Sequence, residues 1–332
     1  MGKEEFPYRF YYHALKPNEK KAYELFLDGL RHMAKEITLP KEKGEDLNFM
    51  RATVAVKYDH PELDFLAENT IWRQEYEDKI VVIPHYVYSK EEVKEATKRM
   101  NDYINKNFSD LLNLSSPYQR ILIAHDRLAN AIAYDLNPQA KKDDVYRIDG
   151  PILTGKGVCL GIAKVFMLVL NFLRIKNHVI FGDALYNGGL HAWNVVYFGN
   201  EAYHIDLTWD LKDEYGFIRH RYFMLTNKLI ARSHSFHPDF LIPEGRTNVM
   251  YPFYAKTAFR TLEEAKERLR TMPFNPSRGF EILLPTKLYN KENIEELRRV
   301  IWFENPTTQG LEICSLNYDE IQTFAVFLNK HQ

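Results

Sequence analysis

Gly155-Lys-Gly-Val-Cys159-Leu-Gly161 opens a stretch of sequence that continues through His191-Ala-Trp-Asn194 and ends with His204-Ile-Asp206-Leu-Thr-Trp-Asp210. A cysteine, a histidine and an aspartate follow one another here in the order that thiol acyl-transfer chemistry uses. Each of the three also stands in the local setting that its role would require. This stretch therefore provides the starting hypothesis for both the fold and the function.

The residues after Val158 show the spacing of a helix with one buried face. Small or apolar side chains recur three, one, three, one, three and three positions apart, at Cys159, Ile162, Ala163, Phe166, Met167, Leu170 and Leu173. Cys159 is thus placed at the N-terminal end, where free backbone N–H groups and the helix dipole stabilise a thiolate. Gly155 and Gly157 permit a close approach of the backbone, and the Cys159 amide can donate to a developing oxyanion.

The histidine and the aspartate are predicted to lie on a β-hairpin. We expect strands over residues 178–181, 190–197 and 202–208, with a turn at Gly199-Asn200 joining the last two. If the turn is a two-residue loop, Trp193 lies opposite Asp206, and His191 and Asp206 share one face as diagonal neighbours about 7–8 Å apart. A three-residue loop without a bulge would put them on opposite faces.

Each of the three residues also has a purely structural explanation. Cys159 is equally a small buried residue of its helix, His191 a half-buried histidine, and Asp206 a turn or capping residue. Their joint occurrence favours the chemical interpretation. Trp193 and Trp209 fit either the wall of an acyl-binding cleft or ordinary core packing.

The motifs Gly-x-Gly-x-Cys, His-Ala-Trp-Asn and Asp-x-Thr-Trp-Asp resemble those of the transglutaminase-like superfamily, in its bacterial branch, over about Tyr118 to Met224. The resemblance implies an α+β, papain-like core in which a helix bearing the cysteine packs on an antiparallel sheet bearing the histidine and the aspartate. It implies Cys159 as nucleophile, His191 as general base and acid, and Asp206 as its orienting partner.

Further residues are candidates for the cleft or the oxyanion site. Tyr134, within Ala-Tyr-Asp, resembles a position where family members carry a Tyr-Asp pair, although core packing explains it equally well. Gly157 and Trp193 are the other two candidates for this role. The segment from Tyr222 to Thr226 and the later His237 also resemble companions of the family core.

Composition narrows the class of protein. The 332 residues carry 44 Lys and Arg against 45 Asp and Glu, a formal net charge of -1, so no global field favours nucleic acid or an anionic membrane. The start of the chain lacks an apolar signal core, and the longest apolar stretch, residues 165–173, is too short to span a bilayer. We therefore expect a cytoplasmic protein without nucleic-acid or membrane partners.

The chain has two cysteines, Cys159 and Cys314, which excludes a disulfide framework and a four-cysteine zinc site. In a reducing compartment both are expected to be free, although a single bridge between them is compatible with the count. The spacings of His178, His191 and His204 fit no compact zinc motif, and no phosphate-binding glycine pattern is present. No cofactor and no metal are expected.

Around the core we expect an α+β N-terminal region over residues 1–88 and a small α/β subdomain over residues 251–332, leaving residues 89–250 for the core. The expected helices cover residues 17–33, 89–107, 116–134, 261–271 and 291–301, and the expected strands outside the core cover residues 79–84, 280–284, 311–316 and 321–328.

The sequence thus predicts a thiol enzyme that acts on amide bonds of a protein or peptide substrate through an acyl-enzyme. Water would resolve the acyl-enzyme in a protease or amidase, and an amine would resolve it in a transglutaminase. We expect hydrolysis, because cleavage is the less demanding outcome. A non-catalytic binding or scaffold protein that keeps the fold is the alternative of another class, and the intact triad argues against it.

Overall fold

The computed structural model describes residues 6–41, 48–136, 143–186, 188–213, 216–236, 242–272, 280–304, 311–317 and 322–329. Its contacts divide the chain into two compact units. The first unit comprises Met1–Ala124 and Asp135–Val179, and the second comprises His125–Tyr134 and Ile180–Gln332. The expected domain boundaries near residues 88 and 250 stay predictions.

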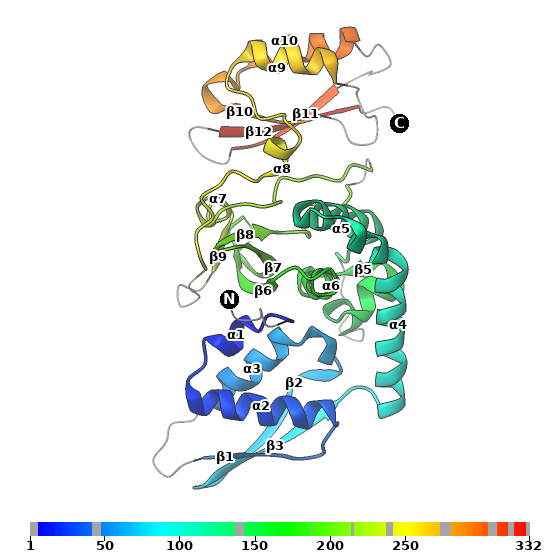
Figure 1. Ribbon diagram of the computed structural model, residues 1–332, viewed down its shortest axis with the longest axis vertical. Helices are drawn as coiled ribbons and strands as arrows, with labels where there is room; N and C mark the ends of the chain where they lie inside the picture. Colours follow the sequence, from blue (N-terminus) through cyan, green and yellow to red (C-terminus); the bar gives the residue numbers. More distant parts are fainter. Residues whose placement is uncertain are drawn as a thin grey trace. The chain divides into compact units, whose positions relative to one another are not determined.

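The first unit begins with three helices and a three-stranded antiparallel sheet (Figure 1). The helices are α1 (Phe10–His13), α2 (Pro17–Arg31) and α3 (Phe49–Asp59), and the sheet has the order β1 (Ile37–Pro40), β3 (Lys79–Tyr86), β2 (Leu66–Glu75). Helix α2 buries Tyr23, Phe26 and Leu30, which are completely enclosed, as its apolar spacing predicts. The predicted helix from Pro17 and the strand from Lys79 are confirmed, whereas α1, α3, β1 and β2 were not predicted.

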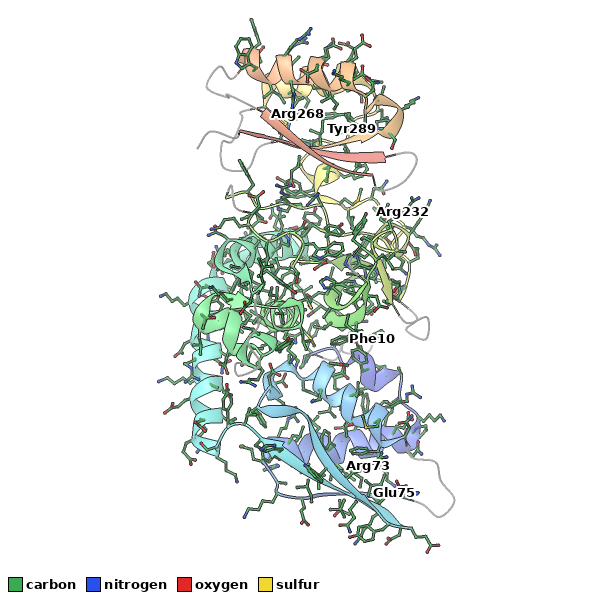
Figure 2. All side chains as sticks on the ribbon, turned by 180° about the vertical axis from the view of Figure 1, so that it is seen from behind. Phe10, Arg73, Glu75, Arg232, Arg268 and Tyr289 are labelled. Atoms are coloured by element: carbon green, nitrogen blue, oxygen red, sulfur yellow. The ribbon has the colours of Figure 1, made fainter. Side chains whose placement is uncertain are left out.

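Ring stacking and hydrogen bonds attach α1 within this unit. Phe10 is labelled in Figure 2. Its ring stacks on the His178 ring with centroids 3.7 Å apart. The Asp59 carboxylate, at the end of α3, accepts hydrogen bonds from the backbone N–H groups of Tyr11 and Tyr12 at 3.0 and 2.8 Å. Burial raises the pKa of Asp59 to about 6, although these two hydrogen bonds oppose the shift.

Helices α4 (Lys90–Phe108), α5 (Pro117–Ala131) and α6 (Cys159–Phe172) were all predicted. Ser89 precedes α4 and forms a capping box: its hydroxyl accepts from the Glu92 N–H, and the Glu92 carboxylate accepts from the Ser89 N–H. Helix α5 ends at Ala131, earlier than expected, and Tyr134 lies instead in the two-residue strand β4 (Ala133–Tyr134). Between β4 and α6 come the short 3-10 helix η3 (Asp143–Tyr146), the short π-helix η4 (Gly150–Thr154) and the strand β5 (Lys156–Gly157).

A four-stranded antiparallel sheet has the order β8 (Glu201–Ile205), β7 (Gly189–Phe198), β6 (Asn177–Ala184), β9 (His234–Phe236), and all of it from Ile180 onward belongs to the second unit. Phe198 pairs with Glu201 and Asn194 with Ile205, so the turn at Gly199-Asn200 is the two-residue loop on which the predicted register depends. Strand β8 ends at Ile205 rather than at Thr208, because the chain turns at Asp206.

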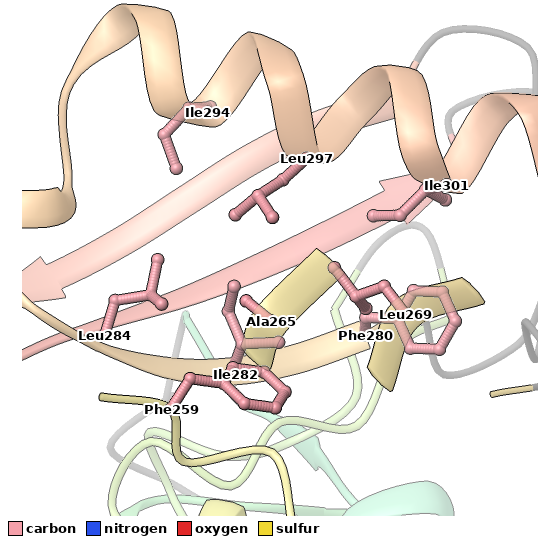
Figure 3. Close-up of a cluster of buried hydrophobic side chains, with 9 residues drawn as sticks. All are labelled: Phe259, Ala265, Leu269, Phe280, Ile282, Leu284, Ile294, Leu297 and Ile301. Atoms are coloured by element: carbon pink, nitrogen blue, oxygen red, sulfur yellow. The ribbon is translucent and has the colours of Figure 1, made fainter. Parts of the chain in front are cut away.

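The C-terminal part of the second unit is a small α/β layer of its own. The sheet β10 (Phe280–Pro285), β12 (Gln322–Asn329), β11 (Leu311–Asn317) is antiparallel. Helices α9 (Leu262–Thr271) and α10 (Lys291–Glu304) contribute Leu269, Leu297 and Ile301 to one apolar cluster with the sheet residues Ile282 and Leu284 (Figure 3). The predicted elements of this region are confirmed.

The described structure therefore combines helices with antiparallel sheets, as the predicted α+β class requires. Two further short helices, α7 (Asn227–Ile230) and α8 (Tyr251–Tyr254), lie between the central sheet and the C-terminal layer in sequence. Among the helices of the described ranges, none has the length and apolar character needed to cross a membrane.

Candidate active site

Cys159 is the first residue of α6 in the first unit. Val158 precedes the helix in extended conformation and no side chain caps the helix start, so the first N–H groups of α6 are not used by a cap. Cys159 is a free cysteine of intermediate exposure. The thiol thus has the helix-start position that the periodicity predicts.

Backbone packs tightly against the start of α6. A Cβ atom on Gly161 would come within 2.4 Å of the Val145 carbonyl oxygen, and one on Gly157 would come within 2.7 Å of the Pro151 ring. The Val158 N–H donates to the Val145 carbonyl at 3.0 Å. Because Gly157 and Gly161 have no side chain, the segment that contains Val145 and Pro151 can pack closely against the backbone around Cys159.

One buried lysine of α6, Lys164, joins this helix to neighbouring segments of the first unit. Lys164 donates from Nζ to Asp64 at 2.6 Å and to the Tyr146 carbonyl at 3.3 Å. The ion pair neutralises the charge inside the apolar surroundings of α6, as a buried charge requires.

His191 and Asp206 meet in the second unit, as the hairpin register predicts. His191 Nε2 lies 2.8 Å from Asp206 Oδ2, and both side chains are buried. Asp206 Oδ1 accepts from the Thr208 N–H at 3.0 Å. Burial opposes ionisation of Asp206, but the charges and hydrogen bonds of His191 and His234 outweigh burial and lower its pKa to about 2.

Because the Asp206 carboxylate is ionised, it can only accept hydrogen bonds. His191 must then carry a proton on Nε2, which leaves Nδ1 as the proton acceptor of the neutral ring. This is the tautomer that a general base needs. The carboxylate therefore sets the protonation pattern of His191.

A second histidine, His234, also contacts Asp206. Its Nε2 lies 3.0 Å from the same oxygen, Oδ2, and its Nδ1 lies 2.8 Å from the Ser233 hydroxyl. His234 was not among the residues predicted for the site, because it comes from β9, 28 residues after Asp206 along the chain. His237, the companion suggested by sequence, lies outside the described residues.

Aromatic rings enclose the His191 side chain. Its ring centroid lies 5.4 Å from that of Trp209 and 6.0 Å from that of Trp193. Trp193 is only 1% exposed and donates from Nε1 to His204 Nδ1 at 2.9 Å. Trp193 is therefore a packed layer beside His191, which corresponds to the core-packing alternative for this residue.

His204 and Asn227 complete a chain of hydrogen bonds that begins at Trp193. His204 Nε2 lies 3.0 Å from Asn227 Oδ1, and the Asn227 amide donates to the Ile242 carbonyl at 3.0 Å. Since the tryptophan N–H only donates, His204 Nδ1 accepts and Nε2 carries the proton. Burial lowers the pKa of His204 to about 4, although the hydrogen bond to Asn227 opposes the shift, so the ring is neutral.

Small residues on β6 allow side chains of β7 and β9 to meet across that strand. Gly182 pairs with Phe236, and Ala184 pairs with His234. A Cβ atom on Gly182 would lie 2.9 Å from the Trp193 ring and 1.8 Å from the Ser235 carbonyl oxygen. Because Gly182 has no side chain between them, the Trp193 and His234 rings can approach to a centroid distance of 4.7 Å.

The backbone of Tyr222 connects Asp206 with a second buried carboxylate, Asp210. The Tyr222 carbonyl accepts from the Asp206 N–H at 3.0 Å. The Tyr222 N–H donates to both carboxylate oxygens of Asp210, at 3.2 and 3.0 Å. The turn that carries Asp206 is thereby fastened to the segment that precedes α7.

Asp210 borders a buried network of charged side chains. Its carboxylate lies 3.6 Å from His125 Nε2, and His125 Nδ1 lies 3.1 Å from Asp126. His220 lies between Asp126, at 2.8 Å, and Glu281 of β10, at 2.6 Å. Burial disfavours the charged His220 ring, but the Glu281 charge and the hydrogen bonds to both carboxylates outweigh it and raise the pKa of His220 to about 10.

Two groups of described residues have the composition of a metal site. His191, Asp206 and His234 form one, and His125, Asp126 and His220 form the other; in each, the ligand atoms lie within 4.8 Å of one another. The contacts of 2.8 and 3.0 Å at Asp206 and of 2.8 and 3.1 Å at Asp126 have the lengths of hydrogen bonds. We therefore interpret both groups as hydrogen-bonded networks.

The remaining predicted site residues have simple positions. Tyr134 is 42% exposed, which excludes core packing for it. Gly157 acts through its lack of a side chain, as described above. The Cys314 backbone lies in β11, and its side chain is outside the described part of the chain.

Comparison with solved structures finds only distant similarity. A structure described as a TGase is 16% identical with a TM-score of 0.30, and the match covers 52% of this chain and 51% of that one. A candidate cysteine protease from Cytophaga hutchinsonii is 14% identical with a TM-score of 0.29, and the match covers 43% of this chain and 63% of that one. A candidate protease from Parabacteroides distasonis is 10% identical with a TM-score of 0.28, and the match covers 80% of this chain and 62% of that one. This chain thus spans less than two thirds of each of these structures, and likeness at this level supports no inference about activity.

No curated protein matches the chain. The model of the family described as the transglutaminase-like superfamily matches residues 106–219. This range contains Cys159, His191 and Asp206, and it begins and ends within about a dozen residues of the limits expected from the motifs. Residues 106–219 of this chain therefore match the transglutaminase-like superfamily.

Proposed function

We propose that the chain is a cysteine-dependent acyl-transfer enzyme that acts on amide bonds of peptides or proteins. In this proposal Cys159 is the nucleophile, His191 the general base and acid, and Asp206 the partner that orients His191. The observation that carries the proposal is the 2.8 Å hydrogen bond between His191 Nε2 and the buried Asp206 carboxylate. The position of Cys159 at the uncapped start of α6 supports it independently.

The proposed reaction has two halves. His191 takes the proton of the thiol, and the Cys159 sulfur attacks the amide carbonyl carbon while backbone N–H groups at the start of α6 stabilise the oxyanion. The C–N bond breaks as His191 returns the proton to the departing amine, which leaves a thioester. Water then attacks the thioester, its proton passes through His191 to the sulfur, and a carboxylic acid is released.

An exposed aromatic side chain near His191 supports a polypeptide substrate. Tyr186 is 69% exposed. The Tyr186 ring lies 6.0 Å from that of Trp209, which in turn packs against His191. Large exposed apolar side chains next to a reactive group are typical of a surface that binds a partner chain.

Hydrolysis is the favoured outcome, since water needs no second binding site. Incubation of the protein with a glutamine-containing protein and a labelled amine distinguishes the two outcomes. Hydrolysis predicts cleavage without incorporation of the label. Incorporation that is lost in Cys159→Ser would instead establish transamidation.

Alkylation of Cys159 tests the proposal without knowledge of the substrate. In a Cys314→Ser chain, Cys159 is the only thiol, so iodoacetamide reports it alone. We expect alkylation at pH 6 to be at least about tenfold faster than that of free cysteine, and to slow down in His191→Ala. His32→Ala is the matched control, because His32 is largely exposed in the first unit.

Two results would overturn the enzyme proposal. One is a Cys159 that reacts no faster than free cysteine, and the other is a rate that is the same in His191→Ala and His32→Ala. Either would favour a non-catalytic protein that retains the fold.

A further inference from the structure

His234 is a buried side chain with more polar contacts than packing alone requires. The side chain is fully enclosed, and both of its ring nitrogens have partners: Asp206 on Nε2 and Ser233 on Nδ1. Four aromatic rings surround it, with centroids between 4.4 and 5.7 Å away, those of Trp209, Trp193, His191 and Tyr222. Such enclosure holds the ring in one orientation.

The two histidines compete for one oxygen atom. His191 Nε2 and His234 Nε2 lie 2.8 and 3.0 Å from Asp206 Oδ2, whereas Oδ1 accepts from the Thr208 N–H. Each hydrogen bond that the Asp206 carboxylate accepts spreads the negative charge of the carboxylate over one more partner. The electrostatic support that Asp206 gives to a protonated His191 ring is therefore weaker than that of a carboxylate with a single imidazole.

Ser233 can satisfy His234 in either protonation state. Its hydroxyl lies 2.8 Å from His234 Nδ1 and 3.3 Å from the Ile230 carbonyl oxygen. It donates to Nδ1 when the ring is neutral. When the ring is charged, Nδ1 donates to the hydroxyl, which then donates to Ile230.

We propose that His234 is a positioning residue of the proposed active centre, which holds the Asp206 carboxylate and shares it with His191, so that His191 releases its proton more readily. The inference rests on the proposed function for the role of His191, but its physical content concerns His191 and Asp206 alone. Strand β9 would then belong to the active centre through its pairing with β6.

Few other titratable groups face these two rings within the described residues. His204 packs near His234 and is neutral, because burial lowers its pKa to about 4. Tyr222 packs against His234, and burial raises the pKa of its hydroxyl, so it is neutral as well. Asp206 is thus the charged group whose sharing decides how strongly His191 binds its proton.

Two substitutions separate this role from simple packing. His234→Phe keeps a ring but removes the donor to Asp206, whereas His234→Gln keeps an amide donor and removes the ring. If His234 acts on Asp206, we expect the pKa of His191 to rise by about half a unit or more in His234→Phe and to stay within about 0.2 units of wild type in His234→Gln. If it only packs, Phe is the milder change.

The measurement is a ¹⁵N-histidine NMR titration of the full chain, with the His191 signal assigned from a His191→Gln spectrum. Melting temperatures of both variants show that they are folded. An unchanged pKa and tautomer of His191 in folded His234→Phe would overturn the proposal. If neither variant folds, the Ser233→Ala chain provides the titration, since loss of the Nδ1 partner weakens the hold of His234 on Asp206 and should raise the pKa of His191.

The same titration distinguishes this inference from the proposed function. It reads His191 directly and does not require a reactive Cys159. A shifted His191 with an unreactive Cys159 would support the role of His234 and reject the enzyme. An unchanged His191 pKa together with a reactive Cys159 would reject the role of His234 and support the enzyme.

Discussion

The buried ion pair between His220 and Glu281 leads to the strongest prediction for stability. Glu281 accepts from the His220 N–H at 2.8 Å through one oxygen and contacts Nδ1 at 2.6 Å through the other. Glu281→Gln removes the negative charge and nearly preserves the volume. The substitution leaves the charged, buried His220 ring with one fewer negatively charged partner. It should therefore destabilise the second unit.

The size of this destabilisation can be worked out from the pKa of His220. A value of about 10, against 6.5 for an ordinary histidine, corresponds to about 5 kcal/mol by which the effect of its partners exceeds the cost of burial. Asp126 still contacts the ring after the substitution, so we expect Glu281→Gln to cost about 3 kcal/mol. For a unit of this size that is a fall of roughly 6–12 °C in melting temperature at pH 7.

The sign of the pH dependence follows from the raised pKa. The stabilisation is complete below about pH 6.5 and is lost as the pH rises towards 10, because the folded protein keeps a proton that the unfolded chain releases. The wild-type melting temperature should therefore fall between pH 6.5 and 10. The fall should be smaller in Glu281→Gln, in which the pKa of His220 is closer to its ordinary value.

Thermal unfolding followed by circular dichroism at pH 6.5, 8 and 10 is the assay. Glu295→Gln is the matched control, because it removes the same charge from a partly exposed pair with Arg298 in the same unit and should cost less than about 0.5 kcal/mol. Equal melting temperatures for the two variants at pH 7 would refute the reasoning. So would a wild-type melting temperature that does not fall between pH 6.5 and 10.

Three further predictions concern the core and the candidate site. Asp206→Asn should leave the fold intact but slow alkylation of Cys159 about 100-fold or more, because an amide can hold the wrong tautomer of His191; an unchanged rate would remove Asp206 from the proposed triad. Gly161→Ala should lower stability by about 1–3 kcal/mol in thermal unfolding, since its Cβ would meet the Val145 carbonyl at 2.4 Å. The low pKa of His204 predicts that stability falls by up to about 3 kcal/mol as the pH drops from 6.5 to 4, and this loss should be smaller in His204→Gln, which keeps an acceptor for Trp193.

The parts of the site that the sequence predicts are those governed by local rules. The helix that begins at Cys159 follows from apolar spacing within a single element, and the face shared by His191 and Asp206 follows from one two-residue turn. Both depend on residues close together in the chain. The predicted register therefore agrees with the structure for the pairs from Asn194 and Ile205 to Phe198 and Glu201, whereas Asp206 lies just beyond the end of β8.

Two features could not be predicted because other contacts decide them. The strand after the turn ends at Ile205, since the Asp206 side chain accepts the Thr208 N–H and turns the backbone. His234 reaches Asp206 only because β9 pairs with β6, and a three-residue strand has no periodicity to read. The small residues Gly182 and Ala184 indicate in the sequence that a neighbouring side chain can pack over β6. They do not indicate which side chain occupies that space.

The Tyr222 backbone has a consequence for how this chain can vary. It accepts from the Asp206 N–H and donates to the Asp210 carboxylate, and Asp210 in turn faces His125. A substitution at Asp210 would therefore displace the proposed catalytic carboxylate without touching any reacting atom. We expect epistasis between Asp206 and Asp210, so that a mutational scan for activity would score a purely structural carboxylate as if it were part of the chemistry.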